Sequence, residues 1–281
     1  MFRSLHLPIL VLLFVSNASS AQKLQISLSG GYAFPVFNTP MQINGYPYAD
    51  LSDKPAVLGS VQYSTHHGAS HGAGLNAELG LTYILNRYFS IGGGLKYGLQ
   101  PKRYTGTGAR GHYTYPLKTT QFVKNPLFAS LCLLVRNETL PGFSIGGGIL
   151  LPLHTDIISE NTSAGTGTDP LIFSSVTLKT SFAIGLSGKL VYSRKITNRL
   201  SLTAAFQVSA LSLWAKSSTL DVLTINGKDY TASVQPGKIH IVYDRNYNPQ
   251  QNTSSGTASV LPSYRIPFNN AQFSLGVAYD L

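Results

Sequence analysis

The sequence predicts an all-β fold, a closed antiparallel up-and-down transmembrane β-barrel of eight strands. Three observations predict it: apolar residues alternate with small or polar ones in eight segments, these segments are long, and the connections between them alternate between short and long. Composition agrees, because 43% of the 281 residues are apolar and only 11% are charged. So few charges cannot cover a water-exposed surface, and the apolar residues must face something other than water.

The first 21 residues have the layout of a cleaved secretory signal. Arg3 precedes an apolar stretch from Leu5 to Val15, and a small-residue cleavage site follows. The stretch contains Pro8 and is too short for a spanning helix, which needs about 20 apolar residues. We therefore expect residues 1–21 to be a signal peptide and residues 22–281 to form the barrel domain.

Each predicted strand places its apolar side chains on one face. In the first strand, Leu24, Ile26 and Leu28 share a face, and the residues between them are polar. Strands of about 9 to 12 residues suit a tilted crossing of a bilayer, whereas strands of soluble sandwiches average about 5 to 6. In order, the eight predicted strands are residues 24–34, 75–83, 89–99, 127–135, 143–153, 182–192, 200–208 and 273–281.

The connections between these strands alternate in length. Three are turns of a few residues, and the other four, near residues 35–72, 100–125, 155–179 and 212–269, are long and polar. In outer-membrane barrels the short turns face the periplasm and the long loops face outward. Because eight strands leave an interior with room only for side chains, a general porin is not expected.

The hexapeptide FSIGGG occurs twice, at Phe89–Gly94 and Phe143–Gly148, each time after a short turn. Its aromatic residue fits the girdle at a membrane surface, and its serine and alternate glycines would point into a crowded interior. A dinucleotide-binding fingerprint would need glycine where Tyr97 and Leu151 stand. The repeat therefore predicts the start of an outward-running strand.

The longest connection contains a further hairpin signal. TLDVLTI and KDYTASV flank Asn226 and Gly227, and another alternating segment, KIHIVYD, follows. These segments predict an extension of the barrel wall above the membrane that presents an edge to a partner. A barrel of ten strands is the alternative.

The last eight residues, SLGVAYDL, resemble the C-terminal assembly signal of bacterial outer-membrane barrels, with Leu281 where the family usually has phenylalanine. The hairpin phrases NRYFSIGGG and TNRLSLTAA also resemble the outer-membrane β-barrel domain common in Bacteroidetes, which is similar to small barrels of the OmpX, OmpA and OmpW kind. The resemblance implies a location in the outer membrane of a Gram-negative bacterium. It implies a fold and a compartment rather than an activity.

Charged residues suggest two features. Glu78 and Lys96 fall on the inward faces of adjacent strands and are expected to form an interior ion pair; two separate charges in interior water are the alternative.

Without Arg3, the chain has 20 basic and 11 acidic residues, a net charge of +9. The basic residues are scattered and no recognition helix is visible, so nucleic acid is not an expected partner.

The expected partners are membrane lipids and lipopolysaccharide, with plain solvation of turns and loops as the alternative. Two groups of basic residues are the expected contacts for these lipids. One group lies by the short turns, and the other lies in the second long connection. The first comprises Arg87, Arg136, Arg194, Lys195 and Arg199, and the second Lys102, Arg103, Arg110, Lys118 and Lys124.

Metal and catalytic sites are weakly indicated. His66, His67 and His71 could bind zinc or copper, but no nearby acidic residue or cysteine completes a site, and a solvated flexible loop is expected. Cys132 is expected to be a small packing residue. No metal or cofactor is predicted.

His154 and Asp156, with Ser159 close by, are the best candidates for a lipid-modifying site near the outer rim. Their positions also fit a strand end that runs into a loop. The predicted function is non-enzymatic, either structural or in recognition through the long loops, whose protein partner is unknown. A lipid A-modifying enzyme and a narrow channel are the alternatives.

Overall fold

The computed structural model describes residues 23–36, 41–43, 64–66, 70–101, 103–110, 113–136, 139–163, 171–234, 239–246 and 259–281. The predicted signal peptide, residues 1–21, lies outside them. No helix in the described ranges has the length and apolarity to cross a membrane.

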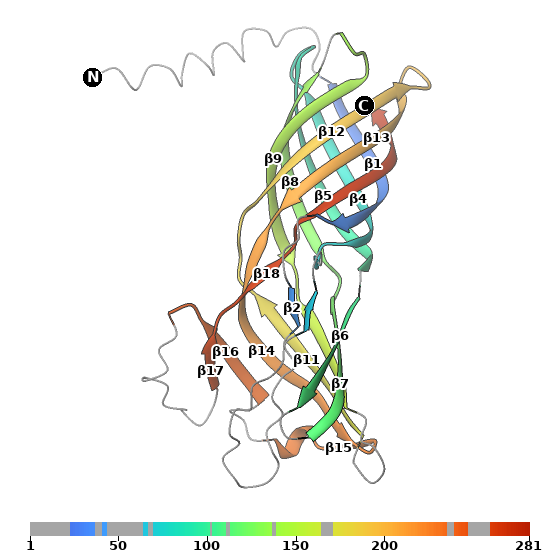
Figure 1. Cartoon of the computed structure of the whole chain (residues 1–281). Helices are drawn as coiled ribbons and strands as arrows, with labels where there is room; N and C mark the ends of the chain where they lie inside the picture. The colour runs from blue at the N-terminus through green and yellow to red at the C-terminus, as the bar shows by residue number, and fades with distance from the viewer. Residues whose placement is uncertain are drawn as a thin grey trace, which may run out of the picture.

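Eight antiparallel strands form a closed barrel, which confirms the predicted fold class (Figure 1). They are β1 (Lys23–Pro35), β4 (Gly74–Ile84), β5 (Phe89–Pro101), β8 (Leu127–Arg136), β9 (Phe143–His154), β12 (Gly185–Lys195), β13 (Leu200–Ala210) and β19 (Asn270–Asp280). Each pairs with the next of the set, and β1 closes the wall by pairing with β19, from Gln25 with Asp280 to Pro35 with Asn270. The alternative of ten barrel strands is wrong.

The outer face of the barrel is apolar, as the alternation predicts. Ile26, Leu79 and Ile145 are 41%, 54% and 63% exposed. The residues that alternate with these apolar ones point into the barrel, where Ser90 and Lys96 are buried. This wall exposes a continuous apolar surface that water would not favour.

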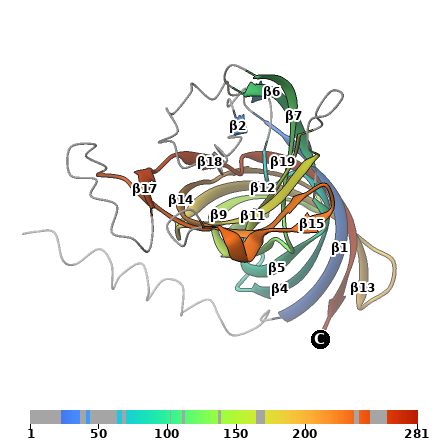
Figure 2. The ribbon, with the colours of Figure 1, turned by 90° about the horizontal axis from the view of Figure 1, so that it is seen from below.

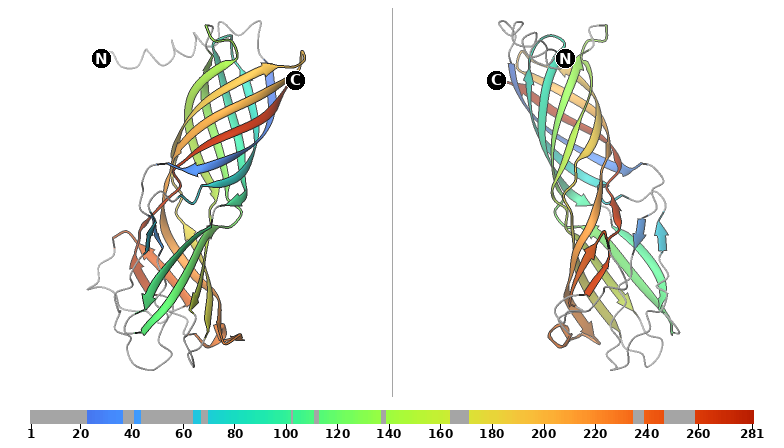
Figure 3. Two further views of the ribbon diagram at one scale, coloured as in Figure 1. Left: turned by 45° about the vertical axis from the view of Figure 1, so that its right-hand side comes forward. Right: turned by 90° about the vertical axis from the view of Figure 1, so that its left-hand side faces the viewer.

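The barrel has two ends: the loop end, where the long connections lie, and the turn end, where the short turns lie. A second sheet of nine strands continues from the loop end (Figure 3). The second sheet, called the outer sheet, contains β6 (Tyr104–Arg110), β7 (Tyr113–Val123), β10 (Ile157–Ser163), β11 (Ile172–Thr180), β14 (Ser212–Ile225), β15 (Lys228–Asp229), β16 (His240–Asp244), β17 (Ser259–Pro262) and β18 (Arg265–Pro267).

Six barrel strands run into the outer sheet after short interruptions. The chain passes from β5 to β6, from β7 to β8, from β9 to β10, from β11 to β12, from β13 to β14 and from β18 to β19. A backbone hydrogen bond of 2.8 Å from Lys124 N to Asp156 O crosses two of these interruptions. The outer sheet therefore continues the barrel wall at the loop end; its position above a membrane stays a prediction.

The predicted hairpin is present at its turn, where β14 pairs with β15 around Asn226 and Gly227, but its second arm is only two residues long and most of KDYTASV is not strand. Both turn residues have positive φ, 51° and 78°, as the tight hairpin turn requires. A short 3-10 helix (Thr231–Ser233) follows, and elsewhere β2 (Met41–Ile43) pairs with β3 (Ser64–His66). Figure 2 shows the molecule from the end that the outer sheet forms.

An apolar core fills the junction between the barrel and the outer sheet. Phe128 and Phe268 pack edge to face within it, with ring centroids 5.9 Å apart. We call this cluster the junction core: Val123, Phe128, Leu150, Ile157, Leu178, Leu211, Leu213, Ala215, Ile266 and Phe268. Because both sheets contribute to it, the core fixes the outer sheet on the barrel.

The repeated hexapeptide has a steric explanation. A Cβ atom at Gly146 or Gly148 would overlap the backbone of β8, and one at Gly94 would lie 2.9 Å from Glu78 Oε1. By contrast, a Cβ atom at Gly147, which faces outward, would lie at an ordinary 3.5 Å from Ser187 O. The inward glycines therefore allow close packing inside the narrow barrel.

We predict that Gly148→Ala lowers the free energy of unfolding by about 1–3 kcal/mol, because β8 must shift to admit the methyl group. Gly147→Ala is the matched control and should change it by less than about 0.5 kcal/mol. Urea unfolding of the protein folded in lipid vesicles measures both values. Equal losses in the two variants would contradict the steric explanation.

Candidate functional site

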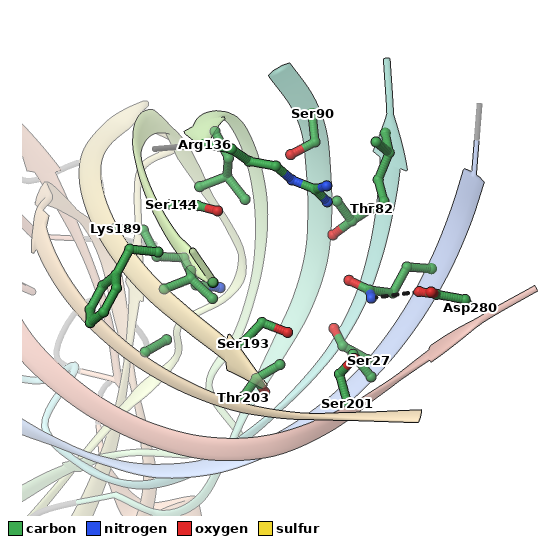
Figure 4. Close-up of a pocket in the computed structure, with 18 of the residues that line it drawn as sticks. Ser27, Thr82, Ser90, Arg136, Ser144, Lys189, Ser193, Ser201, Thr203 and Asp280 are labelled. Carbon is green, nitrogen blue, oxygen red and sulfur yellow. Dashed lines mark hydrogen bonds between the residues drawn. The ribbon is translucent and has the colours of Figure 1, made fainter. Parts of the chain in front are cut away.

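The barrel lumen contains a cavity of about 550 Å³ (Figure 4). It reaches the turn end, because its wall includes Asn86, Arg87 and Gly142 from the turns. Much of the remaining wall is made of short hydroxyl side chains, which leave space at the axis: Ser27, Ser29, Thr82, Ser90, Ser144, Ser193, Ser201, Thr203 and Ser274.

The cavity wall carries more positive than negative side chains. Its acids are Glu78 and Asp280, and its basic residues are Lys23, Arg87, Arg136, Lys189 and Lys195. Asp280 lies near the turn end, where its Oδ1 accepts a hydrogen bond of 2.8 Å from Gln25 Nε2 and its Oδ2 lies 3.9 Å from Lys195 Nζ. The excess of three positive charges gives the cavity a field that favours anions.

A buried cluster of three charges lies at the inner end of the cavity. Glu78 and Lys96 are direct cross-strand neighbours, as predicted. The ion pair, however, joins Glu78 Oε1 to Lys189 Nζ at 3.1 Å, so the expected pairing with Lys96 is corrected. Lys96 interacts with Glu78 electrostatically, and one carboxylate therefore faces two ammonium groups.

A layer of buried amides, Asn76, Gln207, Asn270 and Gln272, lies beside these charges and beyond them toward the loop end. Gln207 is the cross-strand partner of Lys189. Gln207 and Gln272 are cross-strand partners on β13 and β19. The junction core lies further toward the loop end and places packed apolar side chains there.

The three candidate catalytic residues lie in different environments. His154 is exposed, and with Asp156 it lines a small cavity of about 220 Å³ at the junction. Ser159 is 2% exposed, and its Oγ accepts a hydrogen bond of 3.4 Å from Gln121 Nε2. A serine buried in this way is not accessible to a lipid in the membrane.

The histidine-rich segment is only partly described. His66 lies in β3, and His67 is outside the described residues. His71 is buried against Phe268, with ring centroids 5.7 Å apart, which corrects the expectation that it is solvated. Burial lowers the pKa of His71 to about 4, so the ring is neutral at pH 7. Within the described ranges, no three potential metal ligands lie together.

The basic residues near the turns divide into two sets. Arg87, Arg136 and Lys195 line the cavity, whereas Arg194 and Arg199 are exposed residues outside its lining. Arg199 donates a hydrogen bond to Tyr279 Oη at 3.3 Å, which raises the pKa of its guanidinium.

The second basic group lies at the loop end. Lys118 and Lys124 are exposed, and Arg103 stacks on Phe122 with its Cζ 4.4 Å from the ring centroid. Lys102 lies outside the described residues, as does the side chain of Arg110. Cys132, predicted to be a packing residue, is half-buried opposite Gly92.

Sequence reasoning missed two features of the structure. The first is the ion pair of Lys189 with Glu78. The alternation of its strand predicts that Lys189 points inward, but the contact with Glu78 crosses the lumen between strands that are not neighbours. The second feature is a group of two arginines around Trp214. No strand periodicity joins those residues, which are distant in sequence.

The fold and lumen define a class of structure: a closed eight-stranded antiparallel barrel with a filled interior. No protein-family model matches the sequence, and no curated protein matches it either. Among solved structures, the outer membrane protein OprG from Pseudomonas aeruginosa is similar at 11% identity. The match covers 94% of this chain and 98% of that chain, with a TM-score of 0.41.

We predict that Lys96 and Lys189 substitute for each other as partners of Glu78. Lys96→Met or Lys189→Met alone leaves one ammonium group, whereas the double variant leaves a buried carboxylate without a cation, a loss of about 3–5 kcal/mol. A double-mutant cycle of urea unfolding in vesicles measures the coupling. Strictly additive losses would contradict the shared-anion arrangement.

Proposed function

We propose that the chain is an integral outer-membrane protein that displays a rigid β-sheet outside the cell and acts in structure or recognition, without catalysis. The junction core is the observation that carries this proposal. It packs residues of both sheets together, including Phe128 from the barrel and Ile157 from the outer sheet. A loop built only for flexibility would not need a buried core.

The barrel exterior supports the membrane location. Outward-facing Leu28, Leu95 and Leu275 are 57%, 49% and 61% exposed, and burial in hydrocarbon removes the cost of their contact with water. Closure by β1 and β19 leaves the wall without an open edge, as a bilayer demands. The resemblance of the hairpins and the C-terminus supports a Gram-negative bacterium of the Bacteroidetes type.

Recognition is favoured by the form of the outer sheet. Unlike the barrel, it is open, with β6 and β17 at the two ends of its strand order. An edge strand offers backbone hydrogen-bonding groups to an extended peptide. The partner we propose is a protein that reaches the cell surface.

The two alternative functions fit the geometry less well. A channel must pass ions through the lumen, but the amide layer and the junction core occupy it. A lipid-modifying enzyme needs an accessible nucleophile with its base, and Ser159 is buried away from lipid.

Topology can be tested with single cysteines in a Cys132→Ala background. We predict that Lys228→Cys, at the tip of the outer sheet, reacts with a membrane-impermeant maleimide in intact cells. The matched control, Asn198→Cys in an exposed turn at the turn end, should react only after the outer membrane is permeabilised. Labelling of Asn198→Cys alone in intact cells would reverse the orientation and refute the proposal.

A further inference from the structure

Two arginines contact the single tryptophan of the chain. The Cζ atoms of Arg245 and Arg265 lie 4.7 Å and 5.0 Å from the centroid of the Trp214 ring. Arg265 is the cross-strand partner of Trp214 through the pairing of β18 with β14, and Arg245 follows β16. Three segments far apart in sequence therefore build one cluster.

Ser181 holds this cluster against the barrel wall. Its Oγ accepts hydrogen bonds from Trp214 N at 3.1 Å and from Arg245 Nη2 at 3.3 Å. Its own backbone N donates to Trp214 O at 2.8 Å. The segment that links β11 to β12 thus holds the backbone of Trp214 and one guanidinium in place.

The cluster faces outward at the boundary of the apolar wall. Leu213 and Ala215, on either side of Trp214, are buried in the junction core, so the indole lies on the opposite face of β14. Directly after Ser181, Phe182 and Ile184 are 67% and 62% exposed on the barrel exterior. Hydrocarbon-facing residues therefore end where the arginines begin.

Among the described residues, no carboxylate forms an ion pair with the cluster. The neighbouring carboxylate, Asp244, accepts a hydrogen bond from Asn246 N. Exposed Lys179 and Lys216 on β11 and β14 add further positive charge.

These features fit a phosphate at the height of lipid headgroups. A guanidinium stacked on an aromatic ring keeps its charge and its hydrogen-bond donors, which match phosphate geometry. Tryptophan is the side chain favoured at the membrane–water boundary. We propose that Trp214, Arg245 and Arg265 bind a phosphate group of an anionic lipid headgroup in the outer leaflet, such as that of lipopolysaccharide.

This inference rests on the proposed membrane location, so insertion is checked first. Wild type, Arg245→Gln/Arg265→Gln and the control Lys228→Gln are folded in phosphatidylcholine vesicles and compared by heat-modifiable gel mobility. The control removes a positive charge from an exposed residue of the outer sheet that belongs to neither of the two basic groups expected to contact lipid. Failure of wild type to insert would overturn the proposed function itself.

Binding is then measured in detergent micelles with diphosphorylated lipid A. We expect saturable retention in native mass spectra, with a matching change in the fluorescence of Trp214, the single tryptophan. Arg245→Gln/Arg265→Gln should weaken binding by about tenfold or more, because two charge-assisted contacts are lost. The control should differ from wild type by less than about twofold.

Two further arms identify the ligand. Lipid A without its phosphates should bind weakly, and inorganic phosphate alone should not saturate the fluorescence change. Equal binding of dephosphorylated lipid A, or saturation by inorganic phosphate at the same concentrations, would overturn the assignment to a lipid phosphate. An inserted wild type that retains no lipid A, or a double variant that binds as wild type does, would also overturn it.

Discussion

The closed hydrogen-bonded seam between β1 and β19 is the constraint on which the rest of the structure depends. In the proposed membrane location, an open seam would leave unpaired backbone groups of both strands in hydrocarbon, at a cost of several kcal/mol for each group. With the seam closed, the wall can be apolar outside, and exposed Ile26 and Leu28 become stabilising rather than a liability. Closure also sets the narrow lumen, since eight strands leave room only for side chains.

That narrow lumen explains the order in which small, charged, amide and apolar side chains follow one another along the barrel axis. Short serines and glycines keep the turn end open, and Glu78 with two lysines marks the inner limit of the cavity. The amide layer and the junction core then follow toward the loop end. The same core also fixes the outer sheet on the barrel, so one packed region occupies this end of the barrel and holds the sheet in place.

Much of the barrel was predictable because its strands obey a period of two. The inward glycines of FSIGGG and the Asn226–Gly227 turn carry local steric signals, and both were interpreted correctly. Contacts across space were not predictable. The predicted partner of Glu78 was wrong because Lys189 reaches Glu78 across the lumen. The predicted solvation of His71 was wrong because Phe268, which is far away in sequence, buries its ring.

Closure is the central claim, and hydrogen exchange tests it most directly. In the vesicle-embedded protein, backbone amides of β1 and β19 should exchange as slowly as those of β5 and β8, because all four strands are paired on both sides. If β1 and β19 exchanged as fast as the turns while β5 and β8 remained protected, the barrel would be open at this seam and the account would be contradicted.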